Sequence, residues 1–318
     1  MRCTSPRTVG FQSDGKTLCW SSTKYSKEYA TFQLPCGKCI ACRLEYARQT
    51  AIRCVHEASM YENNSFITLT YSDEHLKNNK LNYRDFQLFV KKLRSYISES
   101  DYDENKKIGI FVSGEYGDKT KRPHWHAIIF NWRPSDCVYL RTTDRGDRIY
   151  SSSILDKLWS FNDPIQKPNE IGEVTIQSAG YVARYATKKL SHGKDSSHDY
   201  QPISKRSSKH AIGKKWLEKY WPDVFNHGYV ELNGIKMSIP RYYEKWFKKH
   251  HPERWKDYVT QTKTKIIREA VAKEEKITLA EKKANMHRNA LTGLQIKRNT
   301  VRRKILEQKT KFAKEQKC

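Results

Sequence analysis

The segment RPHWHAIIF (residues 122–130) decides the fold of the central part of this chain. On a β-strand, residues two apart face the same side, so His124 and His126 would point together while Trp125 points the other way. Pro123 suits the beginning of a strand, where its missing N–H is tolerated. The apolar run that follows would carry the strand through a core. The segment therefore predicts a strand that presents two imidazoles side by side; a half-exposed strand with two outward polar residues is the alternative.

Segments of strand type and helix type alternate around this strand. Strands are expected at 66–71 (FITLTY), 108–117 (IGIFVSGEYG) and 172–177 (GEVTIQ). Amphipathic or helix-forming segments are expected at 82–97, 153–159 and 178–190. This mixture predicts an α+β fold.

Glu115 lies on the strand that precedes the two histidines. A strand–turn–strand connection through residues 115–124 would return Glu115 alongside His124 and His126. One carboxylate and two imidazoles suit Mg²⁺ or Mn²⁺, with water and substrate oxygens completing the coordination shell. A solvated carboxylate at a hairpin end is the alternative.

The segment YVARYATKK (181–189) carries two tyrosines four residues apart. On a helix, Tyr181 and Tyr185 share a face, Lys188 joins that face and Lys189 lies close by. Tyrosines on helices commonly pack, but here the small apolar residues between them can serve the core. The tyrosine face would then be free to line a cleft.

The net charge of +25, from 60 Lys and Arg against 35 Asp and Glu in 318 residues, favours a polyanionic partner. No apolar run reaches the roughly 18 residues of a membrane-spanning helix, and residues 1–16 lack the apolar core of a signal peptide. Nucleic acid is therefore the expected partner and the cytoplasm the expected location. A metal, a tyrosine and a lysine beside a nucleic acid indicate phosphoryl transfer through a covalent phosphotyrosine.

The motifs HWH, FITLTY and YVARYATKK, which span residues 66–189, resemble the motifs of HUH endonucleases. The chain as a whole is similar to the rolling-circle replication initiators of microviruses, and closest to the gokushovirus type; PCGKCIACR (35–43) also fits that type. The resemblance implies an antiparallel sheet, similar to an RNA-recognition domain, with helices packed on one side. It also implies an enzyme that nicks one origin strand, keeps the 5′ end on a tyrosine and later rejoins the strand into a circle.

The resemblance implies roles for individual residues. The metal ligands would be His124 and His126, joined by Glu115 on the strength of its position; the catalytic group would comprise Tyr181 and Tyr185 as alternating nucleophiles, with Lys188 and Lys189 orienting phosphate or tyrosine. Residues Lys121, Arg122 and Arg184 are the expected DNA contacts. No P-loop of the form GxxxxGK[ST] is present, so unwinding would need a host helicase, alongside a host polymerase, in the bacterial cytoplasm.

Six of the eight cysteines precede residue 55, which favours metal binding over disulfides in a reducing compartment. The CxxCxxC spacing of Cys36, Cys39 and Cys42 suits zinc or an iron–sulfur cluster. Cys54 is the predicted fourth ligand. Other candidates for that position are His56, Cys19 and Cys3. Alternatively, Cys39 and Cys42 are small buried residues at the beginning of a helix.

The chain divides by composition into four regions: a Cys-rich segment (1–62), the expected endonuclease core (63–195), a basic aromatic accessory region (196–255) and a basic tail (256–318). The tail holds 18 basic and 7 acidic residues and favours helix. It is either a solvated helical tail or a DNA-binding arm.

Two further functions stay open from the sequence: a relaxase or transposase of the same superfamily, and a non-catalytic single-stranded DNA-binding protein. In several relaxases the tyrosine precedes the histidines, whereas here it follows them.

Overall fold

The computed structural model describes residues 3–100, 107–117, 120–188, 203–207, 211–284 and 291–315. They form two compact units, one from residues 1–46 and 253–318 and the other from residues 47–252. Helix α1 (Ile40–Ala58) begins in the first unit and continues into the second. Helices and strands are mixed in an α+β fold, as predicted. Within the described ranges no helix is both long and apolar enough to cross a membrane.

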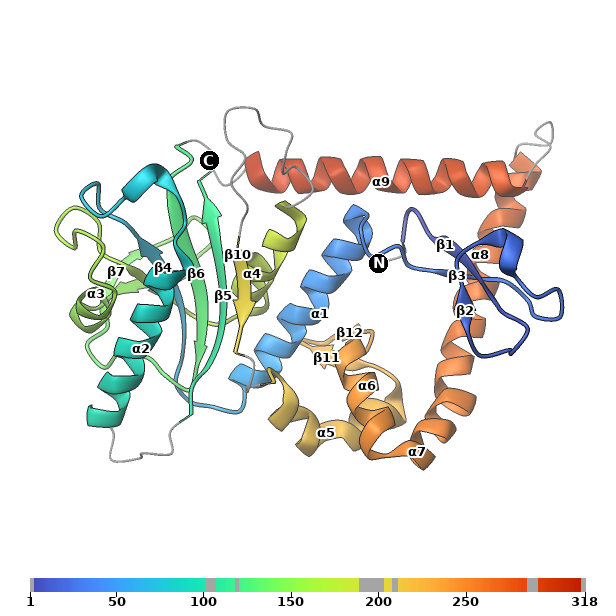
Figure 1. The fold of residues 1–318 in the computed structure, drawn as a ribbon, viewed down its shortest axis with the longest axis horizontal. Coiled ribbons are helices and arrows are strands. Elements are labelled where there is room, and N and C mark those ends of the chain that lie inside the picture. Colours follow the sequence, from blue (N-terminus) through green and yellow to red (C-terminus); the bar gives the residue numbers. More distant parts are fainter. Residues whose placement is uncertain are drawn as a thin grey trace. The chain divides into compact units, whose positions relative to one another are not determined.

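A seven-stranded sheet forms the centre of the second unit (Figure 1). Its strand order is β10-β5-β6-β4-β9-β8-β7, and every pair is antiparallel. The strands are β4 (Asn64–Thr70), β5 (Gly109–Tyr116), β6 (Pro123–Phe130), β7 (Val138–Thr142), β8 (Arg148–Ser151), β9 (Glu170–Gly172) and β10 (Ile203–Arg206). The antiparallel sheet is thus confirmed, and the hairpin β5–β6 lies inside it.

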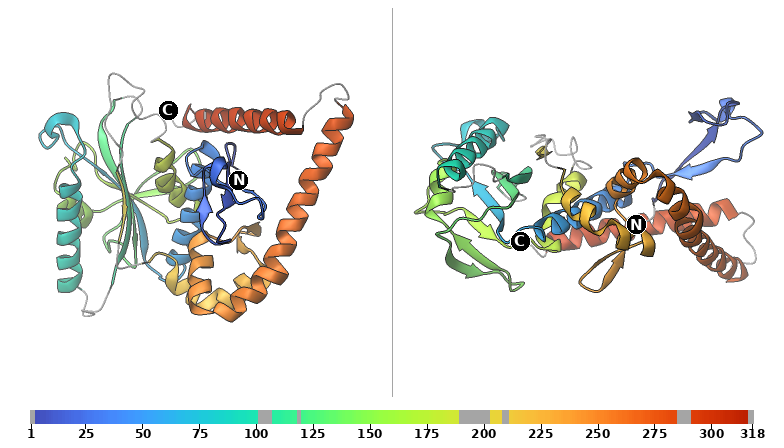
Figure 2. Two further views of the ribbon diagram at one scale, coloured as in Figure 1. Left: turned by 45° about the vertical axis from the view of Figure 1, so that its right-hand side comes forward. Right: turned by 90° about the horizontal axis from the view of Figure 1, so that it is seen from below.

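Helices cover both faces of this sheet, so the expectation of helices on one side is wrong. One face packs against α2 (Tyr83–Ser100) and α3 (Ser153–Trp159), and the other against α1 and α4 (Ile176–Lys188) (Figure 2). The physical reason is the composition of β5 and β6, which are apolar on both sides and buried along almost their whole length. Strands buried on both faces need a helical layer on each.

Two apolar clusters fill the space between the sheet and its helices. Trp125, Phe89 and Trp159 belong to the cluster under α2 and α3. Ile128 and Val182 belong to the cluster under α1 and α4. Trp125 therefore points to the face opposite His124 and His126, as the alternation along the strand predicts.

The predicted elements at 66–71, 108–117, 82–97 and 153–159 are confirmed within a few residues. The strand predicted at 172–177 is wrong, because β9 ends at Gly172 and α4 begins at Ile176. Thr175 and Ser178 cap this helix reciprocally: the Ser178 N–H donates to Thr175 Oγ1 (3.1 Å) and the Thr175 N–H to Ser178 Oγ (2.8 Å). These caps convert an alternating segment into a helix start.

The accessory part of the second unit packs on α1. It contains α5 (Lys214–His227), β11 (Val230–Leu232), β12 (Ile235–Met237) and α6 (Arg241–His250). His56 of α1 stacks on Trp216 with ring centroids 3.5 Å apart, and its Nδ1 lies 2.9 Å from the Tyr243 hydroxyl. Helix α7 (Pro252–Asp257) follows at the boundary of the unit.

The first unit contains a small sheet of order β2-β1-β3, built from β1 (Arg7–Phe11), β2 (Leu18–Cys19) and β3 (Phe32–Leu34). Its C-terminal part begins with a π-helical segment (Tyr258–Lys263) and continues through α8 (Thr264–Ala284) and α9 (Leu291–Glu315). The basic tail is therefore helical over the residues described.

Candidate active site

Three neighbouring strands place polar side chains on one face of the large sheet. In the hairpin β5–β6, Glu115 pairs with His124, and on the other side of β6 Thr68 of β4 pairs with His126. Residues on adjacent strands that stand opposite each other have their Cβ atoms about 5 Å apart. The register therefore brings a carboxylate, two imidazoles and a hydroxyl together.

One oxygen, Oε1 of Glu115, is the centre of this group. It lies 3.0 Å from Nε2 of His124 and 3.1 Å from Nε2 of His126. The ligand atoms of the three side chains all lie within 4.8 Å of one another, a spacing that could hold a metal ion.

The group lies at the edge between core and solvent. Glu115 and His126 are buried, while 19% of the His124 side chain is exposed. Phe66 stacks against the His126 ring on its buried side (centroids 5.8 Å, planes 6° apart). Within this group, His124 therefore marks the side from which a substrate can reach these atoms.

The hydrogen bonds of His124 imply a positive charge between its ring and Glu115. Nδ1 of His124 lies 3.1 Å from the carbonyl oxygen of Arg122, which can only accept, so the ring proton belongs on Nδ1. In neutral His124, Nε2 then directs a lone pair at a carboxylate oxygen 3.0 Å away. Two acceptors repel at that distance unless a proton or a metal cation lies between them. The donor set of one carboxylate and two imidazoles fits a divalent cation.

Helix α4 contributes a phenol to the same oxygen. Ala179, Val182 and Ala183 are buried against the sheet and fix the helix. The Tyr181 hydroxyl donates to Oε1 of Glu115 at 3.1 Å, and its ring meets the His126 ring edge to face (4.9 Å, 86°). Tyr181 thus lies beside the predicted ligands, although 66 residues separate it from Glu115 in the chain.

The other members of the predicted catalytic group are only partly described. Tyr185 and Lys188 belong to α4, but their side chains lie outside the described part of the structure, as does the whole of Lys189.

The three predicted DNA contacts lie in different settings. Arg122 pairs with Asp73 and donates to the carbonyl oxygen of Tyr71 (2.7 Å), with 40% of its side chain exposed. Lys121 occupies a left-handed turn position (φ 55°) in the β5–β6 hairpin. The Nε of Arg184 donates to the carbonyl oxygen of Gly180 within α4. Arg122 therefore has a structural role next to β4 in addition to any contact with DNA.

Thr68 is a residue of this site that the motif analysis did not single out. Its Oγ1 lies 3.0 Å from Nδ1 of His126 and so orients the ring. The signal was present in the sequence, because a threonine at the centre of FITLTY alternates with apolar residues and must face the polar side of its strand.

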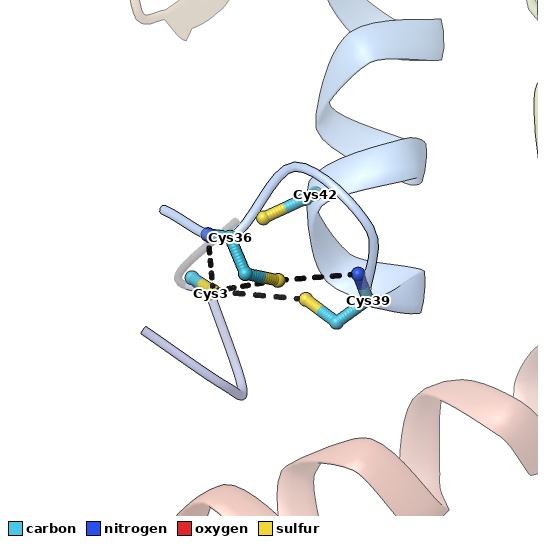
Figure 3. Close-up of side chains that lie close together, drawn as sticks. All are labelled: Cys3, Cys36, Cys39 and Cys42. Atoms are coloured by element: carbon cyan, nitrogen blue, oxygen red, sulfur yellow. Dashed lines mark hydrogen bonds between the residues drawn. The ribbon is translucent and has the colours of Figure 1, made fainter. Parts of the chain in front are cut away.

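A second group of potential ligands consists of four thiols in the first unit. Figure 3 shows Cys3, Cys36, Cys39 and Cys42 gathered around a common point, and their sulfurs all lie within 4.8 Å of one another. Cys54, the predicted fourth ligand, does not belong to this group. Its side chain is fully buried in the apolar cluster under α1 and α4, because residue 54 falls on the inner face of α1. The fourth thiol is that of Cys3.

Comparison with known proteins gives a consistent result. Residues 64–190 match the model of a protein family described as "Replication-associated protein ORF2". The chain is 45% identical to "Replication-associated protein VP4" of Bdellovibrio phage phiMH2K, over 99% of both chains. It is 35% identical to "Replication-associated protein ORF4" of Chlamydia phage 1, over 69% of this chain and 54% of that protein.

A third relative, "Replication-associated protein ORF2" of Spiroplasma virus 4, is 31% identical over 74% of each chain. No solved structure matches. The first relative is aligned from end to end, so the similarity extends well beyond the three motifs. The chain therefore belongs to the replication-associated proteins of microviruses, the family expected from its sequence motifs.

Proposed function

We propose that this protein initiates rolling-circle replication as a metal-dependent, site-specific single-strand DNA endonuclease and strand transferase of the HUH type. The observation that carries the proposal is the meeting of the Tyr181 hydroxyl with Nε2 of His124 and of His126 at one carboxylate oxygen of Glu115. A nucleophile, a cation site and a proton acceptor within one hydrogen-bond radius are the components that phosphodiester cleavage requires.

His124, His126 and Glu115 would hold Mg²⁺ or Mn²⁺, which when bound polarises the scissile phosphate and lowers the pKa of oxygens beside it. Thr68 and the Arg122 carbonyl keep the two rings turned toward the site. Because Glu115 is buried, water does not compete for its Oε1 on the protein side.

In the cleavage step, the Tyr181 oxygen attacks the phosphorus as its proton passes to an acceptor. Glu115 Oε1, 3.1 Å away, is within reach of that proton. The P–O3′ bond breaks, the 3′ oxygen leaves as a 3′-OH, and the 5′ phosphate stays on the tyrosine. Since the phosphodiester is conserved in the phosphotyrosine, rejoining needs no nucleotide hydrolysis.

Tyr185, one helical turn along α4, is proposed to cut the regenerated site after one round of synthesis. The 3′-OH released by that cut attacks the Tyr181 phosphate and closes the circle. Lys188 and Lys189 are proposed to neutralise the phosphate, and Lys121, Arg122 and Arg184 to contact the DNA. Host helicase and polymerase would supply unwinding and synthesis, and the site of action would be the cytoplasm of the bacterial host.

The test is cleavage of labelled single-stranded genomic DNA, presented as a scanning set of oligonucleotides with Mn²⁺. Wild-type protein should form a covalent protein–DNA adduct that disappears with EDTA. Tyr181→Phe, Tyr185→Phe, their double variant and His124→Ala rank the nucleophiles and the metal ligand. Tyr139→Phe, at an exposed tyrosine on β7, is the matched control and should keep full activity.

Folded wild-type protein that binds the DNA without forming an adduct on any segment would contradict the proposal. A non-catalytic single-stranded DNA-binding protein would then be the better description. An adduct that persists in the double tyrosine variant would place the nucleophile elsewhere in the chain.

A further inference from the structure

The four thiols of the first unit have the spacing of ligands to a single tetrahedral metal ion. Sγ of Cys3 lies 3.6 Å from Sγ of Cys36 and 3.7 Å from Sγ of Cys39. Four sulfurs at about 2.3 Å from one Zn²⁺ stand about 3.8 Å apart in a tetrahedron. A disulfide would need about 2.05 Å instead. In an iron–sulfur cluster each thiolate binds a different iron atom, which requires wider spacing than the 4.8 Å limit that encloses all four sulfurs here.

The backbone brings these thiols together from three places (Figure 3). Antiparallel pairing of β1 with β3, with Arg7 opposite Leu34, carries the segment before β1 alongside the loop after β3. This places Cys3 next to Cys36. Cys39 and Cys42 then follow at the beginning of α1, three residues apart, where they share a helix face.

A turn at Gly37 makes the approach of Cys36 and Cys39 possible. Gly37 has φ +70°, a left-handed conformation that glycine adopts without strain. The turn also lets backbone amides point at sulfur: the Cys39 N–H donates to Sγ of Cys36 (3.3 Å), and the Cys36 N–H donates to Sγ of Cys3 (3.3 Å). Amide donors of this kind stabilise metal-bound thiolates and orient them.

The first unit has little else to hold its N-terminal part together. Its three strands contain five, two and three residues. Among residues 3–42, the buried apolar side chains are Cys3, Val9, Cys19, Ile40 and Ala41. So small a core does not stabilise a fold without a disulfide or a metal.

We propose that Cys3, Cys36, Cys39 and Cys42 bind one structural Zn²⁺, which closes residues 3–42 onto the first turn of α1. All four coordination positions are filled by protein thiolates, so the ion takes no substrate and has no part in strand cleavage. The protein would therefore hold two different metals: a tightly bound zinc at the thiols and an exchangeable cation at Glu115, His124 and His126.

The test measures zinc in the full-length protein after purification and dialysis in buffer free of strong chelators. We expect about one zinc per chain by elemental analysis, released when four thiols react with a mercurial reagent. Cys3→Ser should lose this zinc, and cobalt substituted into the wild type should show the absorption of a tetrahedral thiolate site.

The matched control is Cys19→Ser, because Cys19 is buried in the same unit but outside the group of four. Cys54→Ala and Glu115→Gln should also keep full zinc. If Cys3→Ser does not fold, the wild-type cobalt spectrum and thiol count still decide. Wild type without stoichiometric zinc, iron in its place, or zinc that Cys54→Ala abolishes and Cys3→Ser retains would overturn the proposal, without affecting the proposed function.

Discussion

At the residue scale, the charge of Glu115 is the feature on which the candidate site depends. In Glu115→Gln the side chain keeps its shape and can still hydrogen-bond to Tyr181, but it loses the negative charge that faces two imidazoles. We expect cleavage to fall by about 10²-fold or more. We also expect thermal stabilisation by Mn²⁺ to disappear, because a ligand stabilises a protein only in proportion to its affinity for the folded state.

Melting curves with and without Mn²⁺ measure the second effect independently of activity. The control variant Glu231→Gln changes an exposed carboxylate on β11 and should keep both cleavage and the Mn²⁺ shift. Equal Mn²⁺ stabilisation of wild type and Glu115→Gln would remove Glu115 from the ligand set.

Thr68 tests the support behind the histidines. Thr68→Val preserves the shape of the side chain but removes the oxygen 3.0 Å from Nδ1 of His126. Losing a partner of this kind weakens metal affinity by about 10–100-fold. Mn²⁺ titration followed by electron paramagnetic resonance measures the affinity. Thr70→Val, two residues along the same strand, is the control; equal weakening by both variants would indicate general damage to the sheet.

Thr68 and Cys3 also show where residue-level reasoning from the sequence stops. The HWH alternation correctly predicts the directions of His124, Trp125 and His126, because strand geometry is local. The fourth thiol could not be assigned, since the sequence fixes the spacing within 36–42 but not which distant cysteine the pairing of β1 with β3 brings near. Cys54 was the wrong choice because the inner face of α1 is decided by the sheet it packs on.

At the scale of elements, His56 connects α1 with α5 and α6 and makes their packing sensitive to acid. Burial lowers the pKa of His56 from 6.5 to about 3, and Nε2 of the ring is buried with no hydrogen-bond partner among the described residues. Below pH 6.5 the unfolded chain binds a proton that the folded chain does not accept until about pH 3. Stability is therefore lost as the pH falls from 6.5 toward 3.

Denaturant melts across roughly pH 4–7 should show this slope in the wild type and a shallower slope in His56→Phe. His250→Asn removes an exposed histidine and should leave the slope unchanged. An identical pH dependence in wild type and His56→Phe would assign the acid sensitivity to other groups.

The two faces of the hairpin β5–β6 respond differently to a single methyl group. A Cβ on Gly114 would lie 2.5 Å from Cζ3 of Trp125, whereas a Cβ on Gly180 of α4 would meet nothing closer than Ala51 at 3.9 Å. Gly114→Ala should destabilise the protein by about 1–3 kcal/mol through overpacking. Gly180→Ala should stabilise it by about 0.4–1 kcal/mol, because alanine loses less backbone entropy in a helix.

Equilibrium unfolding in urea measures both changes in the free energy of unfolding. Because Trp125 lies between His124 and His126, Gly114→Ala should also weaken Mn²⁺ binding, whereas Gly180→Ala should not. A stable Gly114→Ala variant would mean that the tryptophan has room to move.

Sequence periodicity predicts the elements whose pattern is long and regular, such as α2 and β6. It does not predict β7, β8 and β10, which are short and lie toward the ends of the sheet order, where pairing rather than composition makes the strand. The helices on both faces were foreshadowed by the unbroken apolar runs of β5 and β6, which leave neither face to solvent.

At the scale of the whole molecule, the net charge of +25 makes DNA binding strongly dependent on salt. For single strands, the logarithm of affinity falls with the logarithm of salt concentration by about 0.7 per phosphate contact. If the basic tail contacts DNA, replacing Arg303, Lys304 and Lys309 of α9 by Gln should reduce that slope by about 2.

Fluorescence anisotropy with a random-sequence oligonucleotide measures the slope. The variant that exchanges Arg and Lys at the same three positions keeps the charge and should behave as the wild type. An unchanged slope in the Gln variant would identify α9 as a solvated helix without a role in binding.

The distance along the chain between Glu115 and Tyr181 also has a consequence for protein synthesis. The ligands come from one hairpin, nine residues apart at their closest, so they are translated together and can pair locally. Tyr181 is translated 66 residues after Glu115, on a helix that must pack against a sheet already formed. A nascent chain therefore acquires its cation site before its nucleophile, and a chain that terminates early in translation is unable to cut the genome that encodes it.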